Sequence, residues 1–420
     1  MAVGVLGLAA GLTFACGTFA ADDAATPGVD AADEDAGLAL DSAPPSDARP
    51  EATPSRCSGF DVDAAPSDVC SGKNLAGDPN NCGLCGHVCL DVPVCVGSLC
   101  QPFPYVTGGA GASLDLASVD DTNIYWVDRG RTPNAVFRGP RAQASSESTA
   151  ALLAEVSPTE PVSPVVYNAL IADRIYVKTY SNLYQAPVDG GALTVFSTIS
   201  PTTGGSPLAA SGVHLFQTSP EHGDFVDYAK SDGTLITKQT GIGGAYDLTV
   251  TPDGRYAFVI GRSAVDAGTV DGSAVTRGAL YRYTIATHDM TLVAAIDAMG
   301  TGGSVLAADD EYVYFPEGLA GSILRLAVDA PLGTVPNVLS KGDGRRVSYI
   351  TTDDTRVYWL SSKEPPDFYY WDLLSVDTCG GADRLHLQAH GTGSFLPRGL
   401  LVRGPHIYVA SQDTVYRIAK

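Results

Sequence analysis

The sequence predicts an all-β protein: a seven-bladed β-propeller, residues 101–420, that follows a small disulfide-rich module and a disordered tether. Three observations lead to this prediction. The composition is typical of turn-rich β proteins, because only 17% of the 420 residues are charged while 46 are glycine and 27 proline. One two-strand phrase recurs seven times after residue 101, and seven of the nine cysteines lie within residues 57–100.

The recurring phrase is an apolar strand, a turn rich in Asp and Gly, and a second strand centred on an apolar or aromatic residue. Successive equivalents of Tyr125 are 39 to 57 residues apart, and periods in the forties are typical of four-stranded propeller blades. Segments in which apolar and polar residues alternate follow the copies and supply third strands. The copies span residues 115–128, 168–179, 206–218, 247–261, 304–318, 348–362 and 398–411.

The last blade needs a strand from elsewhere in the chain. Only one further strand, residues 414–418, follows the last copy, whereas residues 102–109 stand before the first copy and have the pattern of a blade's last strand. We expect this N-terminal strand to complete blade seven, because ring closure removes two free sheet edges that would favour aggregation.

Two phrases carry a resemblance to a known repeat. IYWVD (residues 124–128) and VYWLS (residues 357–361) resemble the YWTD-type and related bacterial propeller repeats. YWTD propellers have six copies, and only the first of these phrases keeps the Asp, so the resemblance implies the architecture and not a receptor function. We expect the aromatic residues to pack between neighbouring blades.

The cysteine-rich segment, residues 57–100, contains NCGLCGHVC (81–89) and CVGSLC (95–100). It resembles the stigma-specific cysteine-rich family and similar modules of bacterial secreted proteins and lipoproteins. Zinc ligation, with His87 nearby, is the alternative to disulfides, which we expect in an exported chain. The segment has an odd number of cysteines, so one of them has no partner within it. Cys379 is either the distant partner of Cys57 or, as we favour, a buried free thiol. The seven cysteines are Cys57, Cys70, Cys82, Cys85, Cys89, Cys95 and Cys100.

Residues 1–20 are expected to form an export signal, because they contain an apolar run too short to span a membrane. The run ends LTFACG, which resembles a bacterial lipobox and makes Cys16 the candidate lipidation site; cleavage after Ala20 is the alternative. Residues 21–56 carry nine acidic residues, two basic residues and no aromatics, which predicts a disordered tether. We expect a cell-surface or outer-membrane lipoprotein, otherwise a periplasmic or secreted protein, that contacts the membrane only through the lipid.

Composition and motifs narrow the range of functions that the sequence allows. The formal net charge of −21 argues against nucleic acid as a partner. Phosphate-binding loops, His-Glu-x-x-His and Gly-x-Ser-x-Gly do not occur, and the histidines show no ligand spacing, so neither a cofactor nor a metal is predicted. Asp doublets at residues 120–121, 309–310 and 353–354 recur at one point of the repeat, where we expect strand-linking turns rather than calcium ligands.

First strands line the channel of a propeller, and one register position in them is polar in all seven blades. We favour a non-catalytic binding or scaffold protein for a protein or glycan ligand. The ring is its candidate site, although solvated residues that hold no ligand are the simpler interpretation of the ring itself. The alternative is a propeller hydrolase or lyase with a channel-mouth site, for which Asp115 and Asp247 would supply carboxylates. Ring closure makes Asp115 and Arg398 neighbours that can pair. The candidate binding residues are Asp115, Asn168, Ser206, Asp247, Ser304, Ser348 and Arg398.

Overall fold

The computed structural model describes Cys57 and most of the chain from residue 72 onward. This part is all-β, and it contains no helix long and apolar enough to span a membrane. The described part of the chain does not include the expected export signal with Cys16, the expected tether or Cys70. The described residues are 57, 72–83, 85, 87–146, 149–156, 168–179, 182–198, 207–219, 223–262, 269–270, 273–274, 278–296, 305–318, 321–342, 344–362, 370–390 and 397–420.

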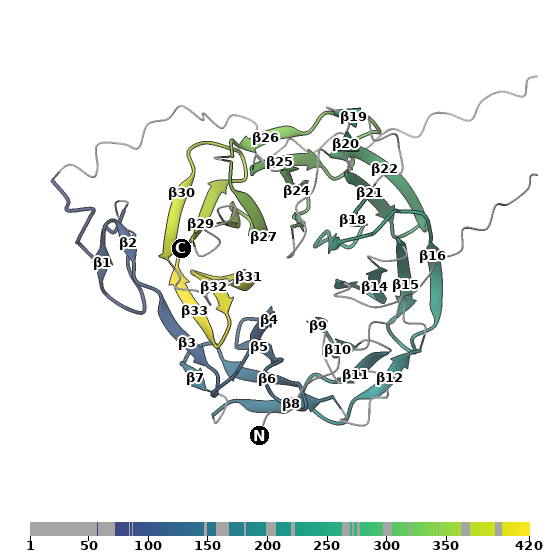
Figure 1. Ribbon diagram of the computed structural model, residues 1–420, viewed down its shortest axis with the longest axis horizontal. Helices are drawn as coiled ribbons and strands as arrows, with labels where there is room; N and C mark the ends of the chain where they lie inside the picture. The colour runs from purple at the N-terminus through teal and green to yellow at the C-terminus, as the bar shows by residue number, and fades with distance from the viewer. Residues whose placement is uncertain are drawn as a thin grey trace, which may run out of the picture. The chain divides into compact units, whose positions relative to one another are not determined.

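Seven sheets stand around a common centre (Figure 1), and in six of them four strands pair antiparallel in chain order. The predicted seven-bladed propeller is confirmed. Blade one contains β4 (Leu114–Val119), β5 (Asn123–Asp128), β6 (Ala135–Pro140) and β8 (Ala151–Glu155); blade two contains β9 (Asn168–Ile171), β10 (Arg174–Lys178), β11 (Leu183–Pro187) and β12 (Thr194–Ser197); blade three contains β13 (Leu208–Ser211), β14 (His214–Ser219), β15 (Asp224–Ala229) and β16 (Leu235–Gln239).

The remaining blades follow the same plan, with one inserted hairpin in blade four. Blade four contains β17 (Asp247–Val250), β18 (Tyr256–Arg262), β21 (Gly278–Thr284) and β22 (Asp289–Ile296), with β19 (Thr269–Val270) and β20 (Ser273–Ala274) inserted. Blade five contains β23 (Ala307–Ala308), β24 (Tyr312–Glu317), β25 (Ser322–Ala327) and β26 (Asn337–Ser340); blade six contains β27 (Arg346–Thr352), β28 (Arg356–Ser362), β29 (Tyr370–Asp377) and β30 (Arg384–His390).

Blade seven is completed by a strand from the start of the propeller sequence. β3 (Phe103–Thr107) pairs antiparallel with β33 (Thr414–Ala419), next to β32 (His406–Ser411) and β31 (Pro397–Arg403), and the short β7 (Ser145–Ser146) pairs with β3 on its other side. Tyr105 on β3 is fully buried, with its ring edge-on to Tyr408 at 5.9 Å and the Arg417 guanidinium 4.5 Å above it. The expected closure is confirmed.

The apolar core lies between neighbouring blades. Tyr358 at the centre of β28 is fully buried and packs in one cluster with Ile407 and Val409 of blade seven. Phe258 of blade four packs in another cluster with Phe315 of blade five. Because alternate residues of a strand share a face, the aromatic positions of the repeat point into these interfaces, as expected.

The first aspartate of each Asp doublet holds the turn between the first two strands of its blade. Asp120 accepts hydrogen bonds from the backbone N–H groups of Thr122 and Asn123 and from the Tyr125 hydroxyl, at 2.6–2.8 Å. Burial alone would raise its pKa, but these hydrogen bonds outweigh burial and lower the pKa of Asp120 to about 2. The expected turn role is confirmed. Equivalent partners are Glu311, Tyr312 and Tyr314 at Asp309, and Thr355, Arg356 and Tyr358 at Asp353.

Disulfides hold the cysteine-rich segment, as expected. Cys82 pairs with Cys95 and Cys89 with Cys100, and Cys85 is also disulfide-bonded. The strands β1 (Cys95–Val96) and β2 (Leu99–Cys100) form a small hairpin that carries one half of each of the two pairs. The sulfur atoms that the zinc alternative would have used are therefore engaged in covalent bonds.

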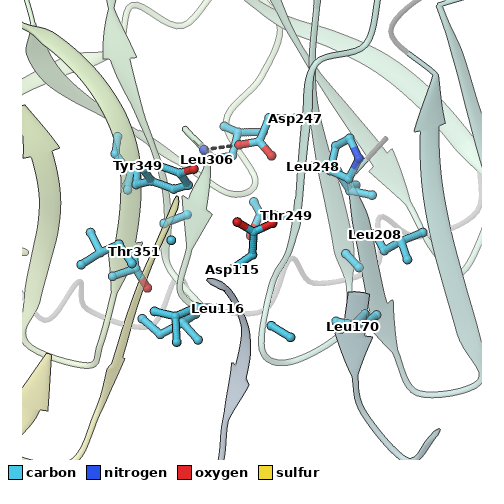
Figure 2. A pocket seen from close by; sticks show the side chains of 18 of the residues that line it. Asp115, Leu116, Leu170, Leu208, Asp247, Leu248, Thr249, Leu306, Tyr349 and Thr351 are labelled. Carbon is cyan, nitrogen blue, oxygen red and sulfur yellow. Dashed lines mark hydrogen bonds between the residues drawn. The ribbon is translucent and has the colours of Figure 1, made fainter. Parts of the chain in front are cut away.

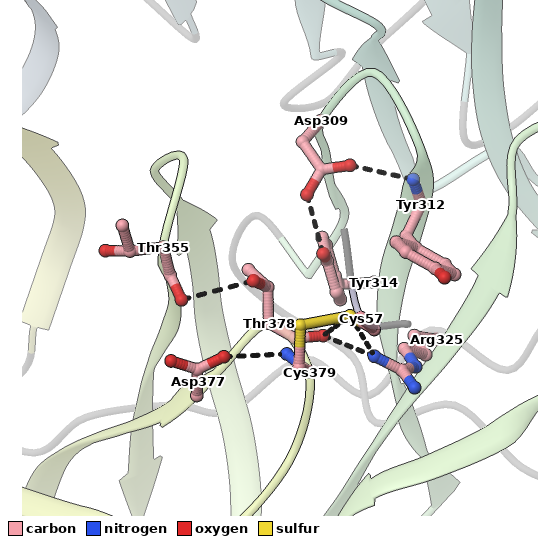
Figure 3. The surroundings of a disulfide bond; sticks show 9 residues. All are labelled: Cys57, Asp309, Tyr312, Tyr314, Arg325, Thr355, Asp377, Thr378 and Cys379. Carbon is pink, nitrogen blue, oxygen red and sulfur yellow. Dashed lines mark hydrogen bonds between the residues drawn. A yellow bond between two sulfur atoms is a disulfide. The ribbon is translucent and has the colours of Figure 1, made fainter. Parts of the chain in front are cut away.

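The expectation of a free thiol at Cys379 is wrong, because Cys379 forms a disulfide with Cys57, 322 residues earlier (Figure 3). Cys379 follows β29, where the Asp377 carboxylate accepts its backbone N–H at 2.9 Å. Arg325 of blade five donates a hydrogen bond to the carbonyl of Thr378. The bond therefore links the start of the cysteine-rich segment to the outer part of blade six, beside blade five.

Ring closure predicts a large stability cost for truncating Tyr105. Tyr105→Ala leaves a cavity between β3 and the rest of blade seven, so we expect the free energy of unfolding to fall by about 3–5 kcal/mol, measured by chemical denaturation of the full chain. Val195→Ala, at an exposed position of β12, is the control, with an expected change within about 0.5 kcal/mol. Equal unfolding free energies for Tyr105→Ala and the parent would contradict closure by β3.

The long-range disulfide predicts that non-reducing peptide mapping recovers Cys57 and Cys379 in one cross-linked pair. Cys379→Ser should lower the free energy of unfolding by about 2–5 kcal/mol, because the cross-link restricts the unfolded chain. Adding Cys57→Ser should cost nothing further. Recovery of Cys379 as an alkylated thiol from the native protein would overturn the pairing.

Candidate functional site

The first strands of all seven blades line a cavity of about 710 Å³ in the central channel (Figure 2). We call it the channel cavity. Its walls are mostly Leu, Ala, Val and Ile side chains, and its polar lining includes two carboxylates, two guanidinium groups and two phenols. The described lining residues include no histidine. The cavity therefore combines apolar side chains with polar groups that converge on the channel, a combination found in small-ligand sites.

Three of the seven candidate binding residues line this cavity: Asp115, Asp247 and Arg398. Ser348 does not, whereas its neighbour Tyr349 does. The pairing of β27 with β28 shifts register between Val347 and Tyr349, and such a bulge changes which residue points inward. The remaining candidates, namely Ser206, Ser304 and the side chain of Asn168, lie outside the described part of the chain.

Asp115 lies between two arginines. Arg129 Nε contacts Asp115 Oδ2, and Arg398 Nη1 lies 3.8 Å from Asp115 Oδ1, so the expected pairing of Asp115 with Arg398 is confirmed. Burial raises the pKa of the Asp115 carboxyl above its ordinary value, and the charges of both arginines oppose that rise. The arginine side chains are 31% and 37% exposed, which leaves part of each guanidinium open to a ligand.

Sequence reasoning missed Arg129, because it lies one residue beyond the repeated phrase. The Asp128 carboxylate fixes the turn there by accepting the backbone N–H groups of Ser113 and Gly130, at 2.9 and 2.7 Å. Position 130 must be glycine, since a Cβ would come within 2.0 Å of the carbonyl oxygen of Gly111. A neighbouring loop thus sets the direction of Arg129, and no single copy of the repeat signals it.

The second carboxylate of the channel cavity is structural. Asp247 is 2% exposed, and its Oδ2 accepts the backbone N–H groups of Val305 and Leu306 at 2.5 and 2.6 Å, which links blade four to blade five. In the same cavity, burial and then the charge of Asp115 raise the pKa of Tyr349 to about 12. The Tyr349 hydroxyl therefore stays protonated at neutral pH and can donate a hydrogen bond to a ligand.

Two histidines that the sequence leaves far apart meet between blades three and four. The fully buried carboxylate of Asp227 lies 3.0 Å from His214 Nδ1 and accepts a hydrogen bond from the Tyr283 hydroxyl at 2.9 Å. That hydroxyl also lies 2.8 Å from His288 Nδ1. The network joins the two blades and lies outside the channel cavity.

Comparisons with known proteins establish the fold and leave the activity open. No protein-family model and no curated protein matches this sequence. A solved structure of a catalytically inactive virginiamycin B lyase from Staphylococcus aureus, with quinupristin, is similar with a TM-score of 0.54 and 10% identity over 76% of this chain and 98% of that chain. A chain of a mitotic checkpoint complex is similar with a TM-score of 0.52 and 11% identity over 76% and 91%. At these identities the similarity shows the fold alone.

The contacts of Asp247 predict a stability role. Asp247→Asn exchanges the charged acceptor of two backbone N–H groups for a neutral amide, so we expect the free energy of unfolding to fall by about 1.5–3 kcal/mol in chemical denaturation. Asp189→Asn, whose side chain is 91% exposed, is the matched control, with an expected change within about 0.5 kcal/mol. Indistinguishable stabilities for the two variants would show that Asp247 does not hold the blades together.

Proposed function

We propose that this chain is an exported, surface-tethered binding protein that takes the end of a glycan in the channel cavity without catalysing its conversion. The observation that carries the proposal is the placement of Arg129 and Arg398 on either side of Asp115. Partly exposed guanidinium groups around a paired carboxylate offer several donors and acceptors to sugar hydroxyl and carboxylate groups.

The contacts of the two carboxylates in the channel cavity support ligand binding rather than catalysis. Asp115 is paired with two arginines, and Asp247 is held by two backbone N–H groups. A general acid or base has to exchange its proton with the substrate, which these contacts oppose for both groups. Carboxylates held in this way are better suited to orienting a ligand than to exchanging a proton with it.

The dimensions of the channel cavity support a small ligand or the end of a chain over a flat protein surface. Its volume of about 710 Å³ lies within the range of small-molecule pockets, about 300–1,000 Å³. In Figure 2, Asp247 and Tyr349 lie near Leu306 and Leu248, so polar and apolar side chains alternate around the cavity. Such a mixture of polar and apolar lining matches a sugar ring, which has hydroxyls at its edge and an apolar face.

The disulfides support the exported location, because they persist in oxidising compartments outside the cytosol. The lipobox-like segment at Cys16 and the acidic tether support attachment to a membrane surface. The net charge of −21 opposes nucleic acid as a ligand, so the proposed partner is a glycan, with a protein partner as the other outcome of a binding screen.

A propeller hydrolase or lyase is the second candidate, and one observation favours it. Asp115 is a carboxyl group in a cavity with its pKa raised by burial, which is typical of general acids in active sites. On this alternative Asp115 protonates or deprotonates the substrate, with Arg129 and Arg398 as orienting groups.

A glycan array of neutral and acidic oligosaccharides, probed with the full chain, tests the binding proposal. Arg398→Ala should abolish binding of the captured glycans while lowering the free energy of unfolding by only about 0–1 kcal/mol, because the Arg398 side chain is partly exposed. Arg403→Ala removes an exposed arginine of the same strand that pairs with Asp121, and binding should be unchanged.

Two results would count against the proposal: no glycan captured by the parent, or equal binding by both arginine variants. Turnover in a hydrolase and lyase screen that falls by about 10²–10⁴-fold in Asp115→Asn would replace binding with the enzyme alternative.

A further inference from the structure

A second cavity, which we call the junction cavity, lies between the cysteine-rich segment and blade six. Its volume is about 400 Å³. β2 and β30 lie beside each other at this place (Figure 1), so the cavity belongs to neither part alone. Its described lining consists of residues 82–83, 87 and 97–100 on one side and of Arg356, residues 382–385 and His386 on the other.

Two guanidinium groups line the junction cavity without a carboxylate partner. Within the described part of the chain, neither Arg356 nor Arg384 forms an ion pair, and Arg384 Nη2 is buried without a hydrogen-bond partner. Burial and then the charge of Arg356 lower the pKa of Arg384 to about 10, which still leaves its guanidinium charged at neutral pH. Two like charges in a partly buried place, without a counter-charge, are unfavourable.

Ser375 on β29 determines which nitrogen of His386 carries the proton. Arg356 Nε donates a hydrogen bond to Ser375 Oγ at 2.9 Å, since a guanidinium can only donate. The same hydroxyl lies 2.8 Å from His386 Nε2. Because this nitrogen is its only other side-chain partner in the described part of the chain, we assign the hydroxyl hydrogen to it. Burial keeps the pKa of His386 well below its ordinary value, so the ring is neutral and its proton is on Nδ1.

The Nδ1–H group of His386 has no acceptor among the described residues. His386 is 3% exposed, and none of the residues that the structure describes forms a hydrogen bond with its Nδ1. The two unmet groups among the described lining residues of the junction cavity are therefore both donors: this N–H group and Arg384 Nη2. Buried donors without acceptors cost free energy, and an acceptor that reaches them removes that cost.

The nearby carboxylates are engaged with other groups. Asp383, which lines the junction cavity, accepts a hydrogen bond from Ser340 Oγ at 2.7 Å. Asp353 contacts the ammonium group of Lys420. Neither carboxylate forms an ion pair with Arg356 or Arg384, so no carboxylate in the described part of the chain balances their charge.

We propose that the junction cavity binds a phosphate or sulfate group, held by the guanidinium groups of Arg356 and Arg384 and by the Nδ1–H group of His386. Two positive charges and three donor groups match an oxyanion with three or more oxygens, and guanidinium binds such groups through paired hydrogen bonds. The group is either a free ion or part of a small ester, for which the cavity has room beyond the anion. This site is independent of the proposed glycan site.

Isothermal titration calorimetry of the full chain, in chloride buffer at constant ionic strength, tests the proposal with three probes: inorganic phosphate, inorganic sulfate and glucose 6-phosphate. We expect saturable binding with one site per chain. Tighter binding of glucose 6-phosphate than of phosphate identifies an ester as the ligand, and equal affinities identify the free ion. Absence of saturable heat with all three probes overturns the proposal.

Arg384→Gln should weaken binding about tenfold or more, because it removes a charged donor. Its melting temperature in chloride buffer without phosphate or sulfate should equal or exceed that of the parent, since it also removes an unpaired charge, whereas loss of a structural arginine would lower it. Ser375→Ala, which retains both arginines and frees the His386 proton, should weaken binding less. Arg403→Gln is the control with unchanged binding. Parental affinity in Arg384→Gln would refute the site.

Discussion

Closure of the ring by β3 is the constraint on which the rest of this structure depends. β3 pairs with β33, so the start of the propeller sequence completes the sheet formed by its end. Closure brings blade one beside blade seven, and the ion pair of Asp115 with Arg398 in the channel cavity spans this seam. Since β3 follows the cysteine-rich segment directly, closure also brings that segment to the outer edge of blades six and seven, where Asp91 contacts Arg417.

Acidic and basic side chains have different tasks in this strongly acidic chain. Many carboxylates accept backbone N–H groups and thereby shape turns or join blades, as Asp120, Asp128 and Asp247 do. This use gives a structural reason for part of the high Asp content, because an ionised carboxylate can accept several hydrogen bonds. Arginines supply the groups open to a ligand in both cavities. The channel cavity has as many carboxylates as guanidinium groups, whereas the junction cavity offers local positive charge inside a protein of net charge −21, which favours a small anionic ligand over large polyanions.

Much of the fold could be predicted from the repeat alone. Strand alternation, turn chemistry and the blade period are local features, so the number of blades, the closing strand, the Asp turns and the burial of aromatic residues such as Tyr358 were all readable. Only part of the candidate site could be predicted from the sequence. Register counting identified Asp115, Asp247 and Arg398 but selected Ser348 where a bulge places Tyr349 in the cavity, and it missed Arg129, whose direction is set by a neighbouring loop.

By itself, then, the sequence determined the architecture of the propeller and the disulfide character of its N-terminal segment, because periodicity and cysteine density are properties of contiguous residues. Tertiary structure alone decided the pairing of Cys57 with Cys379 and the convergence of Arg356, Arg384 and His386 around one serine. These groups are separated along the chain and meet only through strand register and through the docking of one segment on another. Contacts of this kind depend on the relative placement of distant segments, which no local pattern of residues encodes.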